Sequence, residues 1–387
     1  MDEDQNTLQR RKFLKLCAGT GLTAASLSPQ VYAMDQSKPK KTTKRMMIID
    51  ALGDIANENL SEADQAGPNQ GIDARALADA KASGLCAFNH TLGYVFGDQE
   101  PFEFTMREIG IWDALIRRHD TVLTKVYTAN DIRHAQTQGT IGVIYGFQNA
   151  AMMGTDAKRA AIFANLGVKV IQLTYNTRNQ LGDGSMVAEN QGLTEFGREV
   201  VHELNRNKVM VDLSHSGERT CLDAIATSAQ PIIISHTGCR AVTDLPRNKT
   251  DQELKLVADK GGFVGIYFMP FLAIGRQPMA ADLVAHIEHA IQICGEDHVG
   301  IGTDGSVPKI DDMPAYMRNL EIEVEHRRAT GIGAAGERGD IVKFLPDLVG
   351  TDKFYKLATL LEQRGHSSSR IEKIMGLNFL RAADQLW

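Results

Sequence analysis

Two histidines stand directly after apolar runs that read as buried strands. His215 follows Val-Asp-Leu-Ser at 211–214, and His236 follows Ile-Ile-Ser at 233–235. The two are 21 residues apart, the spacing of one βα unit, so neighbouring parallel strands would present both imidazoles to a shared point. Imidazole suits zinc and similar transition metals. One such histidine is more often a structural residue, but the repeated Ser-His pair favours a metal site.

Two further polar side chains occupy positions suited to the same chemistry. Asp304 ends the run Gly-Ile-Gly-Thr, where a carboxylate can bind a metal or take a proton from metal-bound water. The alternative for Asp304 is a cap on the following helix or turn. Arg247 lies in the loop at 244–248, where a guanidinium could hold a carboxylate with two hydrogen bonds. The alternative for Arg247 is an exposed loop arginine without a role.

The elements that must position these residues alternate between short apolar runs and longer amphipathic stretches. Continuous Val- and Ile-rich runs are typical of strands buried on both faces of a parallel sheet. The candidate strands are 46–51, 84–88, 121–126, 141–146, 168–174, 209–213, 231–235, 262–267 and 298–303. The pattern predicts an α/β fold, a closed (β/α)8 TIM-type barrel, with a doubly wound open sheet as the alternative. Nine candidates compete for eight places, and we expect 121–126 to be accessory. Residues 315–387 are expected to be helical and to pack outside.

The first 45 residues are predicted to lie outside the fold. Residues 1–33 carry Arg10-Arg11, a mildly apolar run and Val31-Tyr32-Ala33, the pattern of a twin-arginine signal peptide with its cleavage site. The apolar run is too short to span a bilayer stably. Residues 34–45 read as a linker, and 46–387 as the barrel with its C-terminal helical extension. We therefore expect an exported, periplasmic protein.

Composition narrows the classes of partner. The net charge of −6 gives no basic surplus for binding nucleic acid. Of the five cysteines, four lie beyond the leader at wide and uneven separations, which favours buried thiols over disulfides. The composition therefore predicts a globular protein with no nucleic-acid partner.

The order and surroundings of VDLSH, IIISH, LPRN and GIGTD resemble the membrane (renal) dipeptidase family, the M19 metallopeptidases. The resemblance covers most of the chain after the leader. It implies a (β/α)8 barrel with two zinc ions that cleaves dipeptides, often with a D-residue on the C-terminal side, and that often forms a homodimer. His215 and His236 resemble the ligands of one zinc. Arg247 matches the arginine that binds the substrate carboxylate, and we expect Asn248 beside it to contact the substrate as well. Asp304 matches the aspartate that handles protons.

Other positions depart from the family's pattern. In the family, a His-x-Asp pair at the end of the first strand binds the other zinc. Asp54 matches the aspartate of that pair and is a candidate metal ligand, but Leu52 stands in place of the histidine and cannot bind a metal. Gln148 replaces the glutamate that bridges the two metals. Tyr175 replaces a histidine that stabilises the tetrahedral intermediate, although its hydroxyl can donate to an oxyanion. The losses fall on one metal position, so we expect one zinc, held by His215 and His236, with Asp304 as the candidate third ligand.

The residues leave three functions open. The leading one is an exported metallodipeptidase-like hydrolase of dipeptides or small amides with a free carboxylate. The second is a catalytically silent or accessory barrel that keeps the substrate pocket. The third is altered chemistry on a lactone, ester or other amide.

The remaining histidines and one cysteine carry weaker expectations. His90 follows a predicted strand and is a candidate ligand or substrate contact, with a structural role as the alternative. His286 and His289 are expected to face solvent, and Cys239 to be a small buried residue.

Overall fold

The computed structural model describes residues 46–387, so the predicted leader and linker lie outside the described residues. Eight parallel strands follow one another in the order β1-β2-β4-β5-β6-β7-β8-β9. Backbone hydrogen bonds from Ala51 N–H to the Ile301 carbonyl (3.0 Å) and from Asp304 N–H to the Leu52 carbonyl (2.8 Å) link the last strand to the first. The predicted (β/α)8 barrel is thereby confirmed. The strands are β1 (Ile48–Asp50), β2 (Leu85–Thr91), β3 (Leu123–Lys125), β4 (Ile141–Phe147), β5 (Val168–Gln172), β6 (Met210–Asp212), β7 (Ile233–Thr237), β8 (Phe263–Ile266) and β9 (Val299–Ile301).

The short strand β3 is the accessory element that the excess of candidates predicts. It pairs only with residues 141–143 of β4, beyond which β4 pairs with β5 from Tyr145 onward. Two boundaries also differ from prediction. β2 continues to Thr91 and so includes His90, and β7 continues to Thr237 and so includes His236.

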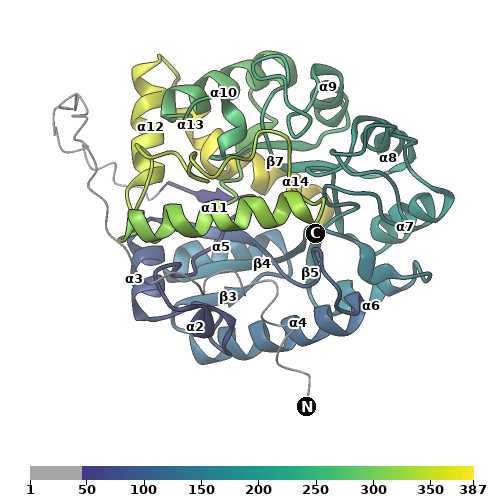
Figure 1. Ribbon diagram of the computed structural model, residues 1–387, viewed down its shortest axis with the longest axis horizontal. Helices are drawn as coiled ribbons and strands as arrows, with labels where there is room; N and C mark the ends of the chain where they lie inside the picture. The colour runs from purple at the N-terminus through teal and green to yellow at the C-terminus, as the bar shows by residue number, and fades with distance from the viewer. Residues whose placement is uncertain (1–45) are drawn as a thin grey trace.

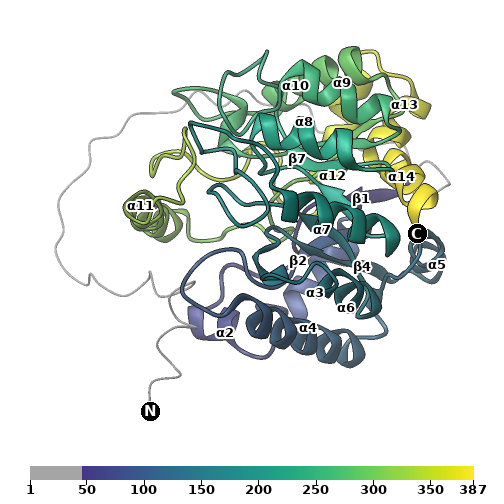
Figure 2. The ribbon, with the colours of Figure 1, turned by 90° about the vertical axis from the view of Figure 1, so that its right-hand side faces the viewer.

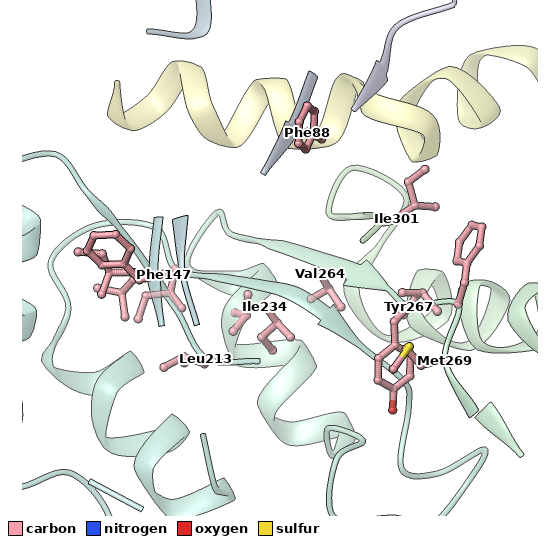
Figure 3. Packing of buried hydrophobic residues seen from close by; sticks show 14 of the residues in the cluster. Phe88, Phe147, Leu213, Ile234, Val264, Tyr267, Met269 and Ile301 are labelled. Carbon is pink, nitrogen blue, oxygen red and sulfur yellow. The ribbon is translucent and has the colours of Figure 1, made fainter. Parts of the chain in front are cut away.

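Strands buried on both faces explain the continuous apolar runs. Every residue of β4 is buried, and the same holds for β6 to β9. Figure 3 shows Leu213, Ile234, Val264 and Ile301, from consecutive parts of the barrel, within one buried apolar cluster. Such a wall of short, rigid strands fixes the positions of side chains at strand ends to within small displacements.

The helices follow the strands and cover the barrel. In α7 (Glu195–Arg206) the buried residues Gly197, Val200, Val201 and Leu204 recur at helical spacing, and the Thr194 hydroxyl accepts the Gly197 N–H (2.9 Å) as a cap. The other helices are α2 (Glu62–Ala66), α3 (Ala74–Ala82), α4 (Pro101–Arg118), α5 (Ala129–Gln138), α6 (Arg159–Asn165), α8 (Glu218–Thr227), α9 (Asp251–Asp259), α10 (Ala280–Cys294), α11 (Met313–Ala329), α12 (Lys353–Gln363), α13 (Ser368–Glu372) and α14 (Asn378–Leu386), with η1 (Ala151–Met153), η2 (Pro270–Leu272) and η3 (Lys373–Leu377). Within residues 46–387, no helix is long and apolar enough to cross a membrane.

The C-terminal helices take two different places. Phe379 and Leu380 of α14 pack with apolar side chains from the amino ends of the strands, such as Met47 and Met210, and so close that end of the barrel. By contrast, α11 lies at the opposite side, in front in Figure 1 and far from α14 in Figure 2. Both helices lie outside the ring of strands, at its two ends, and residues near the C-terminus of α11 contact the strand-end loops, as described below.

Candidate functional site

His215 and His236 come together at the carboxyl end of the barrel, as predicted. Their Nε2 atoms are 3.0 Å apart and both side chains are buried. Burial, with the positive charges of Arg247 and Lys249 nearby, lowers the pKa of both imidazoles well below the ordinary value of 6.5. Both rings are therefore neutral at physiological pH, the state in which imidazole binds metals.

A chain of hydrogen bonds orients His236. The Ser214 hydroxyl lies 2.6 Å from Asp212 Oδ1 and 3.0 Å from the Ser235 hydroxyl, which lies 2.9 Å from His236 Nδ1. Asp212 also accepts the backbone N–H groups of Ser214 and Ser235. If each hydroxyl donates toward the carboxylate, His236 Nδ1–H donates to Ser235 and His236 Nε2 keeps its lone pair.

His215 is oriented from the other side by Asn176. The Asn176 Oδ1 atom lies 2.7 Å from His215 Nδ1 and accepts its proton, so His215 Nε2 also keeps its lone pair. Two lone pairs 3.0 Å apart repel unless a proton or a cation lies between them. Two nitrogens bound at about 2.0–2.1 Å to one tetrahedral zinc lie about 3.3 Å apart. The pair therefore has the spacing and the outer hydrogen bonds of metal ligands.

Arg247 is buried, which removes the alternative of an exposed loop arginine. Its guanidinium donates to the Ser214 carbonyl (2.5 Å), lies 3.3 Å from His215 Nε2 and sits over the Tyr267 ring. Arg247 is thus at the site, as predicted. Both N–H groups of the neighbouring Asn248 amide donate to loop carbonyls, and its oxygen accepts the Tyr267 hydroxyl. The role of Asn248 as a substrate contact stays a prediction, because its amide is already used to shape the loop.

Tyr175 and Asp304 flank this group. The Tyr175 ring stacks on His215, with ring centroids 4.2 Å apart, and its hydroxyl lies 3.5 Å from Arg327 Nη2. Asp304 is half-buried with a left-handed backbone (φ 55°), and burial raises the pKa of its carboxyl to about 6 despite the nearby positive charge of Arg247. A carboxyl with that pKa can exchange protons near neutral pH.

Across residues 46–387, no group of three or more His, Cys, Asp or Glu side chains is placed to hold a metal ion. Asp304 therefore does not complete a three-ligand set with the two histidines. The donor set at this position is the histidine pair alone, and solvent or substrate would have to supply the rest.

The other position that the resemblance assigns to a metal has no imidazole at residue 52 and no carboxylate at residue 148. Leu52 is buried and apolar, and the Gln148 amide donates to the Thr91 hydroxyl (2.8 Å). Asp54 Oδ1 accepts the N–H groups of the two residues that follow it (2.6 and 3.1 Å), so this oxygen serves its own loop. His90 is buried, 3.6 Å from Asp54 Oδ1, with its ring against Trp112. A role for His90 or Asp54 as a ligand stays a prediction.

The two histidines of α10 correct one expectation. His286 is buried, not solvent-facing, because its ring accepts the Cys239 N–H (2.8 Å) and contacts the Leu272 carbonyl (3.1 Å). His289 is partly buried and pairs with Asp251 (2.7 Å). The prediction of buried thiols is confirmed for Cys239 and the other described cysteines, all of which are free.

Sequence reasoning missed three contributors to the site. Asn176 has a local signal, because it directly follows Tyr175 at the end of a strand. Asp212 lies within the strand that leads to His215, and its burial beneath the two serines is visible only in the structure. Arg327, on α11, has no local signal at all.

Comparisons with known proteins show the family to which the chain belongs. The pattern that defines the membrane dipeptidase family (peptidase family M19) matches residues 37–330. Dipeptidase tcpJ of Claviceps purpurea is 29% identical over 283 residues, 72% of this chain and 58% of its own length. An uncharacterized dipeptidase of Schizosaccharomyces pombe is 28% identical over 72% of this chain and 61% of its own. The chain thus spans about 60% of the length of these curated relatives.

Solved structures show the same fold. An amidohydrolase from Pseudomonas aeruginosa is 31% identical with a TM-score of 0.74, covering 88% of this chain and 97% of its own. A metallo peptidase from Rhodobacter sphaeroides, bound to a phosphinate mimic of the dipeptide L-Ala-D-Ala, is 19% identical with a TM-score of 0.71. It covers 89% of this chain and 100% of its own, and at this identity it shows the fold alone. The family pattern extends over most of the chain, and the chain belongs to the membrane dipeptidase family, peptidase family M19.

Proposed function

We propose that the chain is a metal-dependent hydrolase that cleaves dipeptides, or related small amides, with a free carboxylate. One observation carries the proposal: two neutral imidazoles at the carboxyl end of the barrel have their Nδ1 atoms hydrogen-bonded and their Nε2 atoms directed at one point. Membership of a dipeptidase family and relatives described as dipeptidases support it.

His215 and His236 would hold the metal, which we propose to be a single zinc ion. A zinc ion bound there would supply Lewis acidity and a water of lowered pKa. A second ion is not part of the proposal, because Leu52 offers no donor atom and the Gln148 amide is a neutral group in place of a bridging carboxylate.

The other side chains divide the remaining work. Arg247 places a positive charge 3.3 Å from His215 Nε2, which favours an anionic group such as a terminal carboxylate at this point. Tyr175 offers a hydroxyl beside His215 to an oxyanion. Asp304 exchanges the proton that hydrolysis must move from the nucleophile to the leaving amine.

The setting of this activity is also a proposal. The twin-arginine pattern at Arg10-Arg11 supports export to the periplasm. A route of this kind carries folded proteins, so the histidine pair would be assembled before export. A homodimer is proposed only by analogy with the family.

Metal analysis combined with turnover tests the proposal. Purified protein is loaded with zinc, its metal content is measured, and hydrolysis of a panel of L,L and L,D dipeptides is followed. We expect about one zinc per chain and turnover that His215→Ala and His236→Ala both abolish. His202→Ala, an exposed histidine on α7, is the control and should leave both measurements unchanged. Arg247→Ala should raise KM strongly for dipeptides and much less for their C-terminal amides. Zinc-loaded protein that turns over no member of the panel would contradict the proposal.

One observation favours a second candidate, a barrel that binds but does not cleave. The histidine pair has no third ligand among the described residues, and Arg247 already contacts His215 Nε2. This candidate predicts dipeptide binding by calorimetry without turnover at any zinc loading, and binding that Arg247→Ala removes.

A further inference from the structure

Helix α11 and the loop after it, residues 313–337, form a cap at the carboxyl end of the barrel. Figure 2 shows α11 on the side of the molecule opposite α14, and Figure 1 shows it crossing in front of the barrel. Most of α11 is exposed or half-buried, but Arg327 in its last turn is buried. A buried arginine near the end of a largely solvated helix needs a partner inside the protein.

The cap reaches His215 through one hydrogen-bonded path. The Asn176 amide donates from Nδ2 to the carbonyl of Ile332 in the cap (2.9 Å) and accepts at Oδ1 from His215 Nδ1 (2.7 Å). The Ser185 hydroxyl also lies 3.5 Å from Oδ1, but a hydroxyl can donate or accept and so fits either orientation of the amide. The Ile332 carbonyl can only accept, so it decides which way the amide faces, because the reverse orientation would bring two oxygens together. With the amide fixed in this way, Oδ1 faces His215, and the proton of the imidazole stays on Nδ1.

A second path runs through Arg327 and holds the ring that covers His215. Arg327 Nε and Nη2 donate to the two oxygens of Glu337 (2.9 and 2.8 Å), which ties the helix to the end of the cap loop. The same Nη2 lies 3.5 Å from the Tyr175 hydroxyl, and the guanidinium lies over the Phe96 ring. Phe96 stacks on Tyr175, which in turn stacks on His215. The imidazole is therefore held in its plane by Tyr175 and at its edge by Asn176.

We propose that the cap is a working part of the site: through Asn176 and Arg327, acting as positioning residues, it fixes the tautomer and the orientation of His215. Removing the cap contacts frees the Asn176 amide to turn and His215 to carry its proton on either nitrogen. A ring protonated on Nε2 cannot bind a metal through that atom. This role of the cap rests on the proposed function at one point only, the binding of zinc by His215.

Two measurements on the full chain test this, and neither uses turnover. The first is the affinity for zinc, measured by competition with a chromophoric chelator. The second is the tautomer of His215 in the metal-free protein, read from two-bond ¹⁵N–¹H correlations after ¹⁵N-histidine labelling and assigned with His215→Ala. Loss of such an outer hydrogen bond typically weakens metal binding about 10- to 100-fold.

The variants separate the two paths. Asn176→Leu should weaken zinc binding by about 10- to 100-fold and give a mixture of tautomers. Asn176→Asp, which keeps the acceptor for His215 Nδ1, should restore both. Arg327→Met combined with Glu337→Leu keeps an apolar, packed cap without its ion pair, and should weaken zinc binding in the same direction. Arg328→Met alters the neighbouring exposed arginine of the same helix and should change nothing.

The outcomes also distinguish this inference from the proposed function. Unchanged zinc affinity and an unchanged His215 tautomer in both Asn176→Leu and the Arg327→Met/Glu337→Leu variant would overturn the role of the cap. A tautomer that shifts in these variants while the wild type binds no zinc would support the cap and contradict the proposed function. Circular dichroism identifies any variant that fails to fold. If the Arg327→Met/Glu337→Leu variant does not fold, the comparison of Asn176→Leu with Asn176→Asp decides whether Asn176 fixes the tautomer of His215.

Discussion

A buried ion pair lies beneath the histidine pair and should dominate the stability of this part of the barrel. Lys249 Nζ is 3.4 Å from Glu253 Oε1, and the two side chains are 2% and 1% exposed. Lys249 also donates to the Ser216 carbonyl and to Cys221 Sγ. Burial alone would raise the pKa of Glu253, but Lys249 and the Thr250 N–H hold it below its ordinary value, so the pair is ionised.

Removing one member leaves a buried charge without a partner. Lys249→Met or Glu253→Leu should therefore each lower the free energy of unfolding by about 3–5 kcal/mol. The double variant removes both charges and fills the space with apolar groups. It should lower the free energy of unfolding by only about 1–3 kcal/mol, because the Ser216 carbonyl loses its donor and the Thr250 N–H loses its acceptor.

Equilibrium urea unfolding of the four proteins, followed by circular dichroism, measures this cycle. The surface pair Lys255–Asp259 on α9, the helix that also carries Glu253, provides the control. Its members are about half exposed, so removing either should change the free energy of unfolding by no more than about 1 kcal/mol. Single-variant losses below about 1 kcal/mol, or losses that simply add in the double variant, would refute the reasoning that burial makes this pair interdependent.

Three further predictions concern pH, buried histidines and the second metal position. Burial raises the pKa of Asp50 to about 6, so the folded state holds a proton that the unfolded state releases near pH 4. The free energy of unfolding of the wild type therefore falls as pH rises from 4 to 6. In urea unfolding between pH 4 and 7, Asp50→Asn should gain up to about 3 kcal/mol of stability relative to the wild type. A pH-independent difference would show that Asp50 does not titrate in this window. His286→Ala should lower the free energy of unfolding by about 2–4 kcal/mol in the same assay, because it empties a buried, hydrogen-bonded position. His289→Ala should lower it by about 1 kcal/mol or less. Equal losses would contradict the placing of His286 inside the protein and His289 nearer its surface. Leu52→His combined with Gln148→Glu should raise the zinc content, measured by elemental analysis, from about one to about two ions per chain. An unchanged zinc content would show that these two residues alone do not explain the loss of the second metal site.

The sequence predicts the barrel and the histidine pair because both depend on local patterns. Strands buried on both faces appear as apolar runs, and the polar residue that ends each run must lie at the carboxyl end of the barrel. Nine candidates for eight places also predict one surplus strand, and the structure shows that it is β3, within 121–126. The prediction that His215 and His236 form a pair used only the residues of their own two segments.

Features set by distant contacts could not be predicted in this way. His286 and His289 share one helix at a spacing of three, and only the packing of α10 against the Cys239 loop decides which of them is buried. Arg327 reads as one charge among many on a polar helix, because its partners Tyr175 and Glu337 come from other segments. Asn176 has two partners in different parts of the chain, and no local pattern gives an amide that role.

The position of the cap in the chain bears on how the protein is made. Residues 313–337 follow all nine strands, so the ribosome delivers them after the barrel strands are complete. Until then the carbonyl of Ile332 is not available, and the Asn176 amide has no fixed direction. We therefore expect the cap to be added to the site late in synthesis, while α14, which closes the amino end of the strands, is made later still.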